Sequence, residues 1–356
     1  MKETKKTYIE IDGRKIGVGF PAYIVAEISA NHNQKYNQAV KLIEAAKEAG
    51  ADAVKLQTYT PDTITIQSDR PEFKISGGTL WDGRTLYELY GEAFTPWEWQ
   101  PKLKKVANDL GLTLFSTPFD KTAVDFLEKM AVPAYKIASL EIVDIPLIQY
   151  IAGKGKPIII STGATTLDEI KEAVQTAKKA GASQIALLKC TSAYPTPPEE
   201  MNLKTISHMA ATLGVPAGLS DHTLGIAVSV AAVALGACMV EKHLTLSRDI
   251  PGPDSAFSME PQEFKAMVEA IRTAEKALGN ISYEIQAGEA ASRVNRRSVF
   301  AVKDIKAGEV FTEDNIRSIR PGNGLHPRYF KDVLGRKAVK AIKRGTPLSR
   351  EMVGQE

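Results

Sequence analysis

A short apolar run returns about every 20 to 30 residues from Ala22 onward, and most of these runs precede a segment with the apolar spacing of a helix. The runs occupy residues 23–26, 53–56, 112–115, 134–137, 157–160, 185–188, 216–219 and 238–241. Eight successive strand-and-helix units favour the α/β class, as a (β/α)₈ TIM barrel over about residues 20–280. Catalytic residues of such barrels lie at the carboxyl ends of the strands.

The chain has 356 residues, more than a TIM barrel of about 250 residues needs. A last barrel helix is expected at about 261–278, followed by a polar segment and then by short strand-like pieces with Gly-containing turns from Ser298 onward. We therefore predict a catalytic barrel at 1–280, a linker at 281–297 and a small β-rich domain at 298–356. Arg320 stands beside a Pro-Gly turn in that domain, where it can reach a ligand.

Bulk properties exclude several kinds of partner. The net charge of +3 is small and gives no nucleic-acid signature, and no apolar run is long enough to span a membrane. The polar start Met1–Lys6 is unlike a signal peptide, so we expect a cytoplasmic protein. Cys190 and Cys238 lie in apolar runs and are expected to be reduced and packed. No Gly-rich phosphate loop is present, which argues against a nucleotide cofactor.

Two of the five histidines follow neighbouring predicted strands. His222 ends the stretch 218–222, and His243 ends the stretch 241–243, with an apolar helical segment between them. Parallel strands of a βαβ unit end at the same edge of the sheet, so the two imidazoles are expected side by side, where they can share one divalent metal. The alternative is a pair of hydrogen-bonded core histidines. The turn at 249–254 brings Asp254 towards the same pair.

Lysine or hydroxyl side chains occur at nearly every predicted strand end, within runs that are otherwise apolar enough to be buried. A buried lysine needs an anionic partner. Lysines and hydroxyls together can bind the oxygens of a phosphate and a carboxylate. The second βα connection, about 59–94, is unusually long, and all three tryptophans fall in or just after it. It is expected to be either a functional lid or a packed excursion with a structural aromatic cluster.

These motifs resemble the sialic acid synthase family, whose members condense phosphoenolpyruvate with an amino sugar. The matching stretches are 26–32, 55–58, 116–119, 135–139, 161–163, 189–196, 218–222, 241–243 and 320–322. The resemblance covers nearly the whole chain, and its C-terminal part is similar to the antifreeze-like (SAF) domain of the family. The expected enzyme is a C–C bond-forming transferase that releases phosphate.

The resemblance implies roles for individual residues. Glu27, His222 and Asp254 are the expected catalytic residues, and a divalent metal, Mn²⁺ with Mg²⁺ or Co²⁺ as alternatives, is expected on His222 and His243. Phosphoenolpyruvate is expected on Lys55, Thr117, Lys136, Ser139, Ser161, Ser192 and Ser220. The acetamido sugar is expected on Glu27, Gln57, Tyr194, Asp254 and Arg320. Glu27 or Asp254 could instead orient a histidine. A domain-swapped homodimer is implied, in which Arg320 enters the partner's barrel.

Within the family, the stretches 28–33, 80–90, 95–99 and 324–327 resemble the branch that makes pseudaminic acid, from 2,4-diacetamido-2,4,6-trideoxy-L-altrose. Ser192-Ala193 replaces an asparagine and a larger apolar residue that are common in enzymes of the sialic acid type. Synthesis of N-acetylneuraminic or legionaminic acid is the alternative within the family. Outside it, a metal-dependent pyruvate aldolase or a non-catalytic sugar-binding protein remains open.

Overall fold

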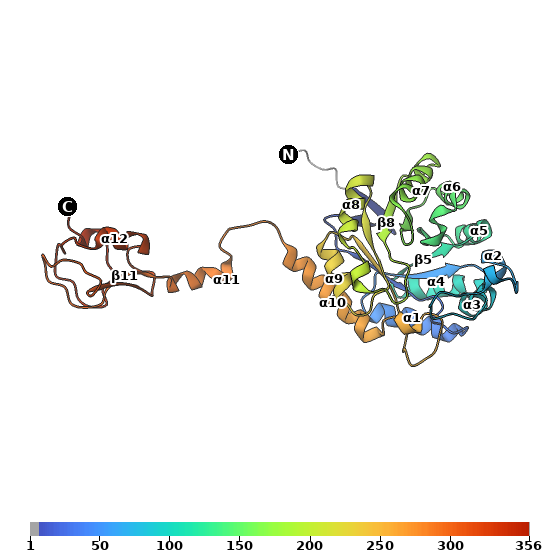
Figure 1. Ribbon diagram of the computed structural model, residues 1–356, viewed down its shortest axis with the longest axis horizontal. Helices are drawn as coiled ribbons and strands as arrows, with labels where there is room; N and C mark the ends of the chain where they lie inside the picture. The colour runs from blue at the N-terminus through green and yellow to red at the C-terminus, as the bar shows by residue number, and fades with distance from the viewer. Residues whose placement is uncertain (1–6, 356) are drawn as a thin grey trace. The chain divides into compact units, whose positions relative to one another are not determined.

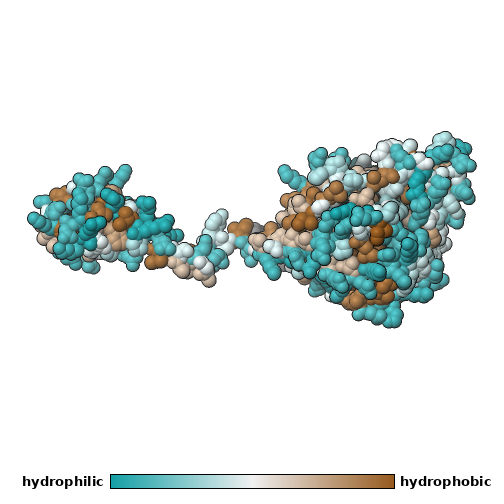
Figure 2. Space-filling view, turned by 90° about the horizontal axis from the view of Figure 1, so that it is seen from below, coloured by the Kyte–Doolittle hydropathy of each residue, from teal (hydrophilic) through white to brown (hydrophobic). Residues whose placement is uncertain are grey.

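A computed structural model describes residues 7–355, which form two compact units that divide after Gly279. The polar start at residues 1–6, on which the expectation of a cytoplasmic protein rested, lies outside the described residues. Each unit has a hydrophobic core of its own. Figure 2 shows that hydrophilic residues cover much of the surface of each unit and that smaller apolar patches are interspersed among them.

The first unit contains a closed barrel of eight parallel strands, in the order β10-β3-β4-β5-β6-β7-β8-β9 (Figure 1). The strands are β3 (Tyr23–Glu27), β4 (Ala53–Thr58), β5 (Thr113–Pro118), β6 (Tyr135–Ile137), β7 (Ile158–Ser161), β8 (Ile185–Lys189), β9 (Ala217–Asp221) and β10 (Met239–His243). Each falls at one of the eight predicted runs. The prediction of a TIM barrel is confirmed.

Helices cover the outside of the strands (Figure 1). They are α1 (Tyr36–Glu48), α4 (Gln100–Asp109), α5 (Lys121–Lys129), α6 (Ile145–Ala152), α7 (Leu167–Lys179), α8 (Lys204–Leu213), α9 (Ala227–Ala234) and α10 (Pro261–Leu278). Helix α7 illustrates why they form. Thr166 and Glu169 make a capping box, and Ile170, Ala173, Val174 and Ala177 give the helix one buried face.

The barrel interior is apolar at its amino end. Alternate residues of a strand point to opposite faces, so Tyr23 and Val25 of β3 point inward while Ile24 and Ala26 pack against the helices. A hairpin of β1 (Tyr8–Ile11) and β2 (Arg14–Gly17) adds Ile9, Ile11 and Ile16 to the inner cluster. This plug leaves only the carboxyl end of the barrel for polar side chains.

The long second connection contains α2 (Pro61–Ile64) and α3 (Leu86–Ala93). Two indole N–H groups, one within this connection and one just after it, donate hydrogen bonds to backbone carbonyl oxygens. Trp97 Nε1 donates to Tyr59 O at 3.1 Å, and Trp81 Nε1 donates to Pro253 O at 2.8 Å. Trp97 therefore has the structural role that was one of the two alternatives, whereas Trp81 reaches the loop after β10.

The C-terminal unit is small, with β11 (Ser298–Ala301) paired antiparallel to β12 (Ile316–Ile319). Short helices α11 (Ala287–Ala290) and α12 (Phe330–Val333) accompany this sheet. Val299, Ile305, Phe311, Ile316 and Leu348 belong to its core. Among residues 7–355, none of the helices combines the length and the apolar character needed to cross a bilayer.

Candidate active site

The alternation of inward and outward residues along each strand, which fills the amino end of the barrel with apolar side chains, also positions the polar side chains at the carboxyl end. Val25, Ala53 and Met239 belong to the inner apolar cluster, and the residues two positions later are Glu27, Lys55 and Glu241. Because the side-chain period of a strand is two, these three side chains enter the same interior one layer higher. All three are at least 95% buried. Of the lysines that the sequence places at strand ends, Lys55 and Lys136 face a common cavity, whereas Lys189 and Lys242 do not line it.

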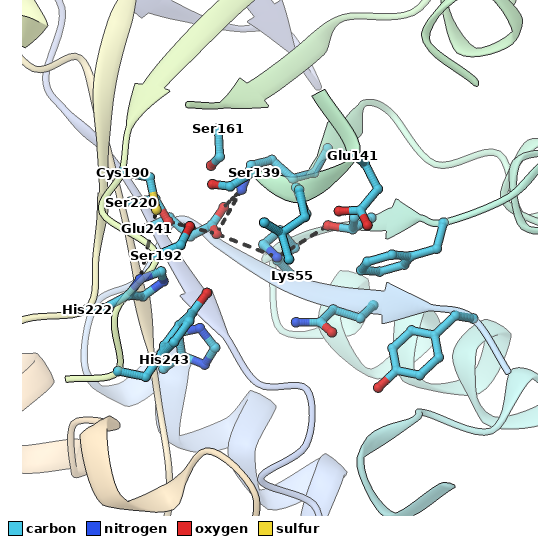
Figure 3. Close-up of a pocket in the computed structure, with 18 of the residues that line it drawn as sticks. Lys55, Ser139, Glu141, Ser161, Cys190, Ser192, Ser220, His222, Glu241 and His243 are labelled. Atoms are coloured by element: carbon cyan, nitrogen blue, oxygen red, sulfur yellow. Dashed lines mark hydrogen bonds and ion pairs between the residues drawn. The ribbon is translucent and has the colours of Figure 1, made fainter. Parts of the chain in front are cut away.

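That cavity has a volume of about 170 Å³ and lies at the carboxyl ends of the barrel strands (Figure 3). The predicted residues that line it are Lys55, Gln57, Thr117, Lys136, Ser139, Ser161, Ser192, Tyr194, Ser220, His222 and His243. Glu27 and Asp254 do not line it but contact residues that do. Arg320 belongs to the C-terminal unit, where it follows β12 and is exposed.

Carboxylates compensate the two buried lysines. Lys136 Nζ lies 2.9 Å from both carboxylate oxygens of Glu241, and Lys55 Nζ lies 3.5 Å from Glu241 Oε1 and forms an ion pair with Glu27. Burial alone would lower the pKa of Lys55, but Glu241 and Glu27 outweigh it and raise that pKa. Burial lowers the pKa of Lys136 despite the same partner. Two lysines thus face two carboxylates, and a bound anion would use the ammonium hydrogens that these ion pairs leave free.

Hydroxyl groups complete this end of the cavity. Ser161 Oγ and Ser192 Oγ are buried and, among the described residues, have no hydrogen-bond partner. Ser139 Oγ accepts from Gly163 N at 3.0 Å. A Cβ at residue 163 would collide with Ser192 Oγ and lie 2.8 Å from Ser139 Oγ, so only glycine fits between these serines. Unpartnered buried donors beside two lysines are what an oxyanion site requires.

The two histidines lie together on one side of the cavity (Figure 3). Their ring centroids are 5.5 Å apart. His222 Nδ1 lies 3.0 Å from Thr191 O, so its proton is assigned to Nδ1 and Nε2 is left for a ligand. His243 Nδ1 is buried, lies 3.4 Å from Asp254 Oδ2 and has no hydrogen-bond partner within residues 7–355. Burial, His222 and the lysines hold the pKa of His243 well below its usual value.

This arrangement fits a divalent metal, because two imidazoles, His222 with Nε2 left for a ligand and His243, lie side by side and face one space. Within residues 7–355 there is no group of three or more His, Cys, Asp or Glu side chains that could hold a metal ion. A metal on His222 and His243 therefore needs further ligands from water or from a substrate.

A buried ion pair lies on the opposite face of the same two strands. Lys242 Nζ contacts Asp221 Oδ2 at 2.8 Å and donates to Thr223 O at 2.6 Å. Asp221 also accepts from Ser229 Oγ at 2.6 Å. Asp221 precedes His222 and Lys242 precedes His243, so this pair holds β9 and β10 together directly behind the histidines.

Aromatic and loop residues form the remaining wall. Tyr194 packs on His222 with a centroid separation of 4.4 Å, and on Phe257 at 5.0 Å. Burial and the nearby Glu27 raise the pKa of Asp254 to about 7. The expectation that the turn at 249–254 brings Asp254 to the histidines matches its 3.4 Å separation from His243.

Sequence reasoning omitted Glu241 and Glu141 from the site. Glu241 has the same inward parity as His243, two residues later, and this signal was available. Glu141 follows β6 on the 3₁₀ helix η3 (Leu140–Val143) and lies across the cavity from the histidines (Figure 3). Burial raises its pKa to about 7. No periodic pattern points to Glu141.

The fold and the site define a TIM-barrel enzyme with an oxyanion site beside a pair of histidines. The family model described as the NeuB family matches residues 42–283, and the SAF domain model matches residues 296–354. The chain therefore belongs to the NeuB family of sialic acid synthases and is a transferase.

Comparison with individual members of the family shows which of them the chain resembles. The chain is 47% identical to the pseudaminic acid synthase of Campylobacter jejuni, over 92% of this chain and 95% of that protein. It is equally similar to the pseudaminic acid synthase of Helicobacter pylori, over 93% of this chain and 97% of that protein. The crystal structure of an N-acetylneuraminic acid synthetase from Leptospira borgpetersenii, in complex with citrate, matches with a TM-score of 0.72 at 31% identity, over 81% of this chain and 95% of that chain.

Proposed function

We propose that this chain is a pseudaminic acid synthase, which condenses phosphoenolpyruvate with 2,4-diacetamido-2,4,6-trideoxy-L-altrose and releases phosphate. The observation that carries the reaction class is the buried group of Lys55, Lys136, Ser161 and Ser192, with two cations and two unpartnered hydroxyls beside a histidine pair. The 47% identity to pseudaminic acid synthases over most of the chain supports the acceptor. N-Acetylneuraminic or legionaminic acid synthesis is the alternative.

The anion end holds phosphoenolpyruvate in this proposal. Its ligands are Lys55, Thr117, Lys136, Ser139, Ser161, Ser192 and Ser220. The lysines neutralise the phosphate and carboxylate, and the serine hydroxyls donate to their oxygens.

His222 and His243 hold the divalent metal, for which Mn²⁺ is the first candidate. When bound, the metal supplies Lewis acidity towards the aldehyde oxygen of the open-chain acceptor. C3 of phosphoenolpyruvate forms a bond to the aldehyde carbon, water adds at C2, and the tetrahedral intermediate breaks its C–O bond to release phosphate. The other product is a nine-carbon 2-keto acid.

The acceptor lies against Gln57, Tyr194 and the carboxyls of Glu27 and Asp254. Glu27 accepts from Ser29 N at 2.7 Å and forms an ion pair with Lys55, and these two contacts hold its carboxylate in place. A group with a pKa near 7, such as Asp254, can accept or donate a proton near neutral pH. Asp254 is therefore the candidate for transferring the proton to the aldehyde oxygen.

The reaction class is tested with phosphoenolpyruvate labelled with ¹⁸O at the bridging oxygen, together with Mn²⁺ and the altrose derivative. Release of phosphate that carries the label is expected, because the C–O bond breaks. An aldolase would instead consume pyruvate and release no phosphate. A sugar-binding protein would bind the acceptor without turnover.

We also propose a homodimer in which Arg320 of one chain serves the barrel of its partner. The support is the family membership and the exposure of Arg320 at a loop. Arg320→Ala and Lys136→Met chains, each inactive alone, are expected to recover about a quarter of wild-type activity when refolded as a mixture, since half the dimers then carry one intact site. No recovery contradicts the exchange. The domain boundaries and the cytoplasmic location remain predictions.

A further inference from the structure

Trp81 joins two loops of the barrel unit that are far apart in the sequence. Its Nε1–H donates to Pro253 O at 2.8 Å, and its ring centroid lies 5.6 Å from that of Tyr194. Pro253 directly precedes Asp254, so Trp81 contacts both loops that carry proposed acceptor residues. None of the catalytic steps described above uses Trp81.

The ring of Trp81 also begins a continuous row of rings. Tyr194 packs on Trp81 on one side and on His222 on the other, and the ring of His222 faces that of His243. The row runs from the proposed metal ligands outward to the second connection. A six-carbon acceptor with its aldehyde at the histidines therefore extends its far end along Tyr194 towards Trp81.

Trp81 stands between two cavities. The reaction cavity is lined by Tyr194 but not by Trp81. An outer cavity of about 760 Å³ is lined by Trp81 together with Leu80, Asn33, Gln34, Arg84 and Glu92. The two cavities have no lining residue in common. The packed rings of Trp81 and Tyr194 thus form a partition that separates the reaction cavity from the outer cavity, and an acceptor too large for the first would have to displace them to enter the second.

The Trp81 side of this partition is apolar, and the phenolic hydroxyl of Tyr194 is the polar group on the other side. The single polar atom of the Trp81 side chain is already bonded to Pro253 O, so its ring has no donor left for a substrate. A methyl group against such a wall loses nothing on burial, whereas a hydroxyl group loses its bonds to water and finds no partner. The wall therefore discriminates between a deoxy and a hydroxylated end of the acceptor.

We propose that Trp81 is a specificity-determining residue that, with Tyr194, forms the wall receiving the 6-deoxy end of the acceptor. This inference rests on the proposed function. The expected preference for the methyl-bearing acceptor is about 10- to 100-fold in kcat/KM, which is the range that one hydroxyl in an apolar pocket produces.

The test compares 2,4-diacetamido-2,4,6-trideoxy-L-altrose with the same sugar carrying a hydroxyl at C6. Trp81→Ala opens the wall to the outer cavity, and Trp81→Phe keeps a ring but removes the bond to Pro253. In Trp81→Ala the preference for the deoxy sugar should fall about 10-fold and the KM for that sugar should rise, while the KM for phosphoenolpyruvate stays within about twofold. Trp81→Phe should lie between wild type and Trp81→Ala.

Trp97→Phe is the matched control, because it removes the same kind of indole bond, from Trp97 Nε1 to Tyr59 O at 3.1 Å. It should leave the sugar preference unchanged. An unchanged preference in both Trp81 variants, an equal loss in Trp97→Phe, or an equal rise in the KM for phosphoenolpyruvate overturns the inference. If Trp81→Ala fails to fold, Trp81→Phe decides. A wild-type enzyme that uses neither altrose sugar contradicts the proposed function instead.

Discussion

Lys55, Lys136 and Glu241 at the anion end of the cavity lie on strands of one hydrogen-bonded barrel, whereas Trp81, Tyr194 and Asp254 at the acceptor end lie on loops. The strand register fixes the first group, and their charges compensate one another within 3.5 Å. Ring packing and an indole bond hold the second group. The site for phosphoenolpyruvate is thus built on strands and the site for the sugar on loops, so substitutions in the loops can change the sugar specificity without changing the phosphoenolpyruvate site.

The most damaging change should be at the anion end. Lys136→Met leaves Glu241 with Lys55 alone at 3.5 Å and removes a phosphoenolpyruvate ligand. Removing one partner of a buried pair costs about 3–5 kcal/mol of folding free energy. Losing one charged contact to the substrate should separately lower kcat/KM for phosphoenolpyruvate about 100- to 1,000-fold. Phosphate release and denaturant unfolding measure the two effects.

Lys105→Met is the control for that change, because Lys105 forms an exposed ion pair with Asp109. It should alter neither turnover nor unfolding measurably. If Lys136→Met behaves like this control, the buried ion pairs of Lys55, Lys136 and Glu241 are not what binds phosphoenolpyruvate.

The histidine pair lies between the two ends and should affect metal binding directly. His243→Ala removes one of the two imidazoles and should weaken Mn²⁺ binding at least about 100-fold, as followed by electron paramagnetic resonance of free Mn²⁺. His208→Ala, which removes an exposed imidazole on α8, should have no effect. Equal Mn²⁺ binding in both variants would place the metal elsewhere.

A milder change at the anion end is Gly163→Ala. Its added methyl group displaces Ser192 and Ser139, so the KM for phosphoenolpyruvate should rise about 10-fold while the KM for the sugar changes less. Gly288→Ala has open space around it and should change neither constant. If the KM for the sugar rises more than the KM for phosphoenolpyruvate, these serines do not bind phosphoenolpyruvate as proposed.

The smallest effect should come from Glu141, whose pKa burial raises to about 7. Its folded state binds the proton more tightly than the unfolded state, so stability falls as the pH rises from about 4.5 to about 7. Glu141→Gln removes this dependence. It should unfold at the same denaturant concentration as wild type at pH 4 and gain roughly 1–3 kcal/mol relative to wild type at pH 8. A difference that does not depend on pH contradicts the raised pKa.

The same comparison explains how much of the molecule could be predicted from the sequence. Strand periodicity located all eight barrel strands, and the polar residues at their carboxyl ends, such as Lys55 and His243, followed from it. Glu241 could have been found from its parity with His243. Trp81 and Glu141 could not, because their positions depend on tertiary packing of loops, which leaves no period in the sequence. The family resemblance, by contrast, covered Trp81 in the stretch 80–90 and Glu241 in the stretch 241–243, but it did not reach Glu141.

The identity of the acceptor is the central claim, and a comparison of three sugars tests it most directly. Phosphate release from phosphoenolpyruvate with Mn²⁺ is measured with the altrose derivative, with N-acetylmannosamine and with the legionaminic acid precursor, each as the sole acceptor. The account predicts turnover with the altrose derivative and a much lower kcat/KM with the other two. A higher kcat/KM with N-acetylmannosamine or the legionaminic precursor would contradict it.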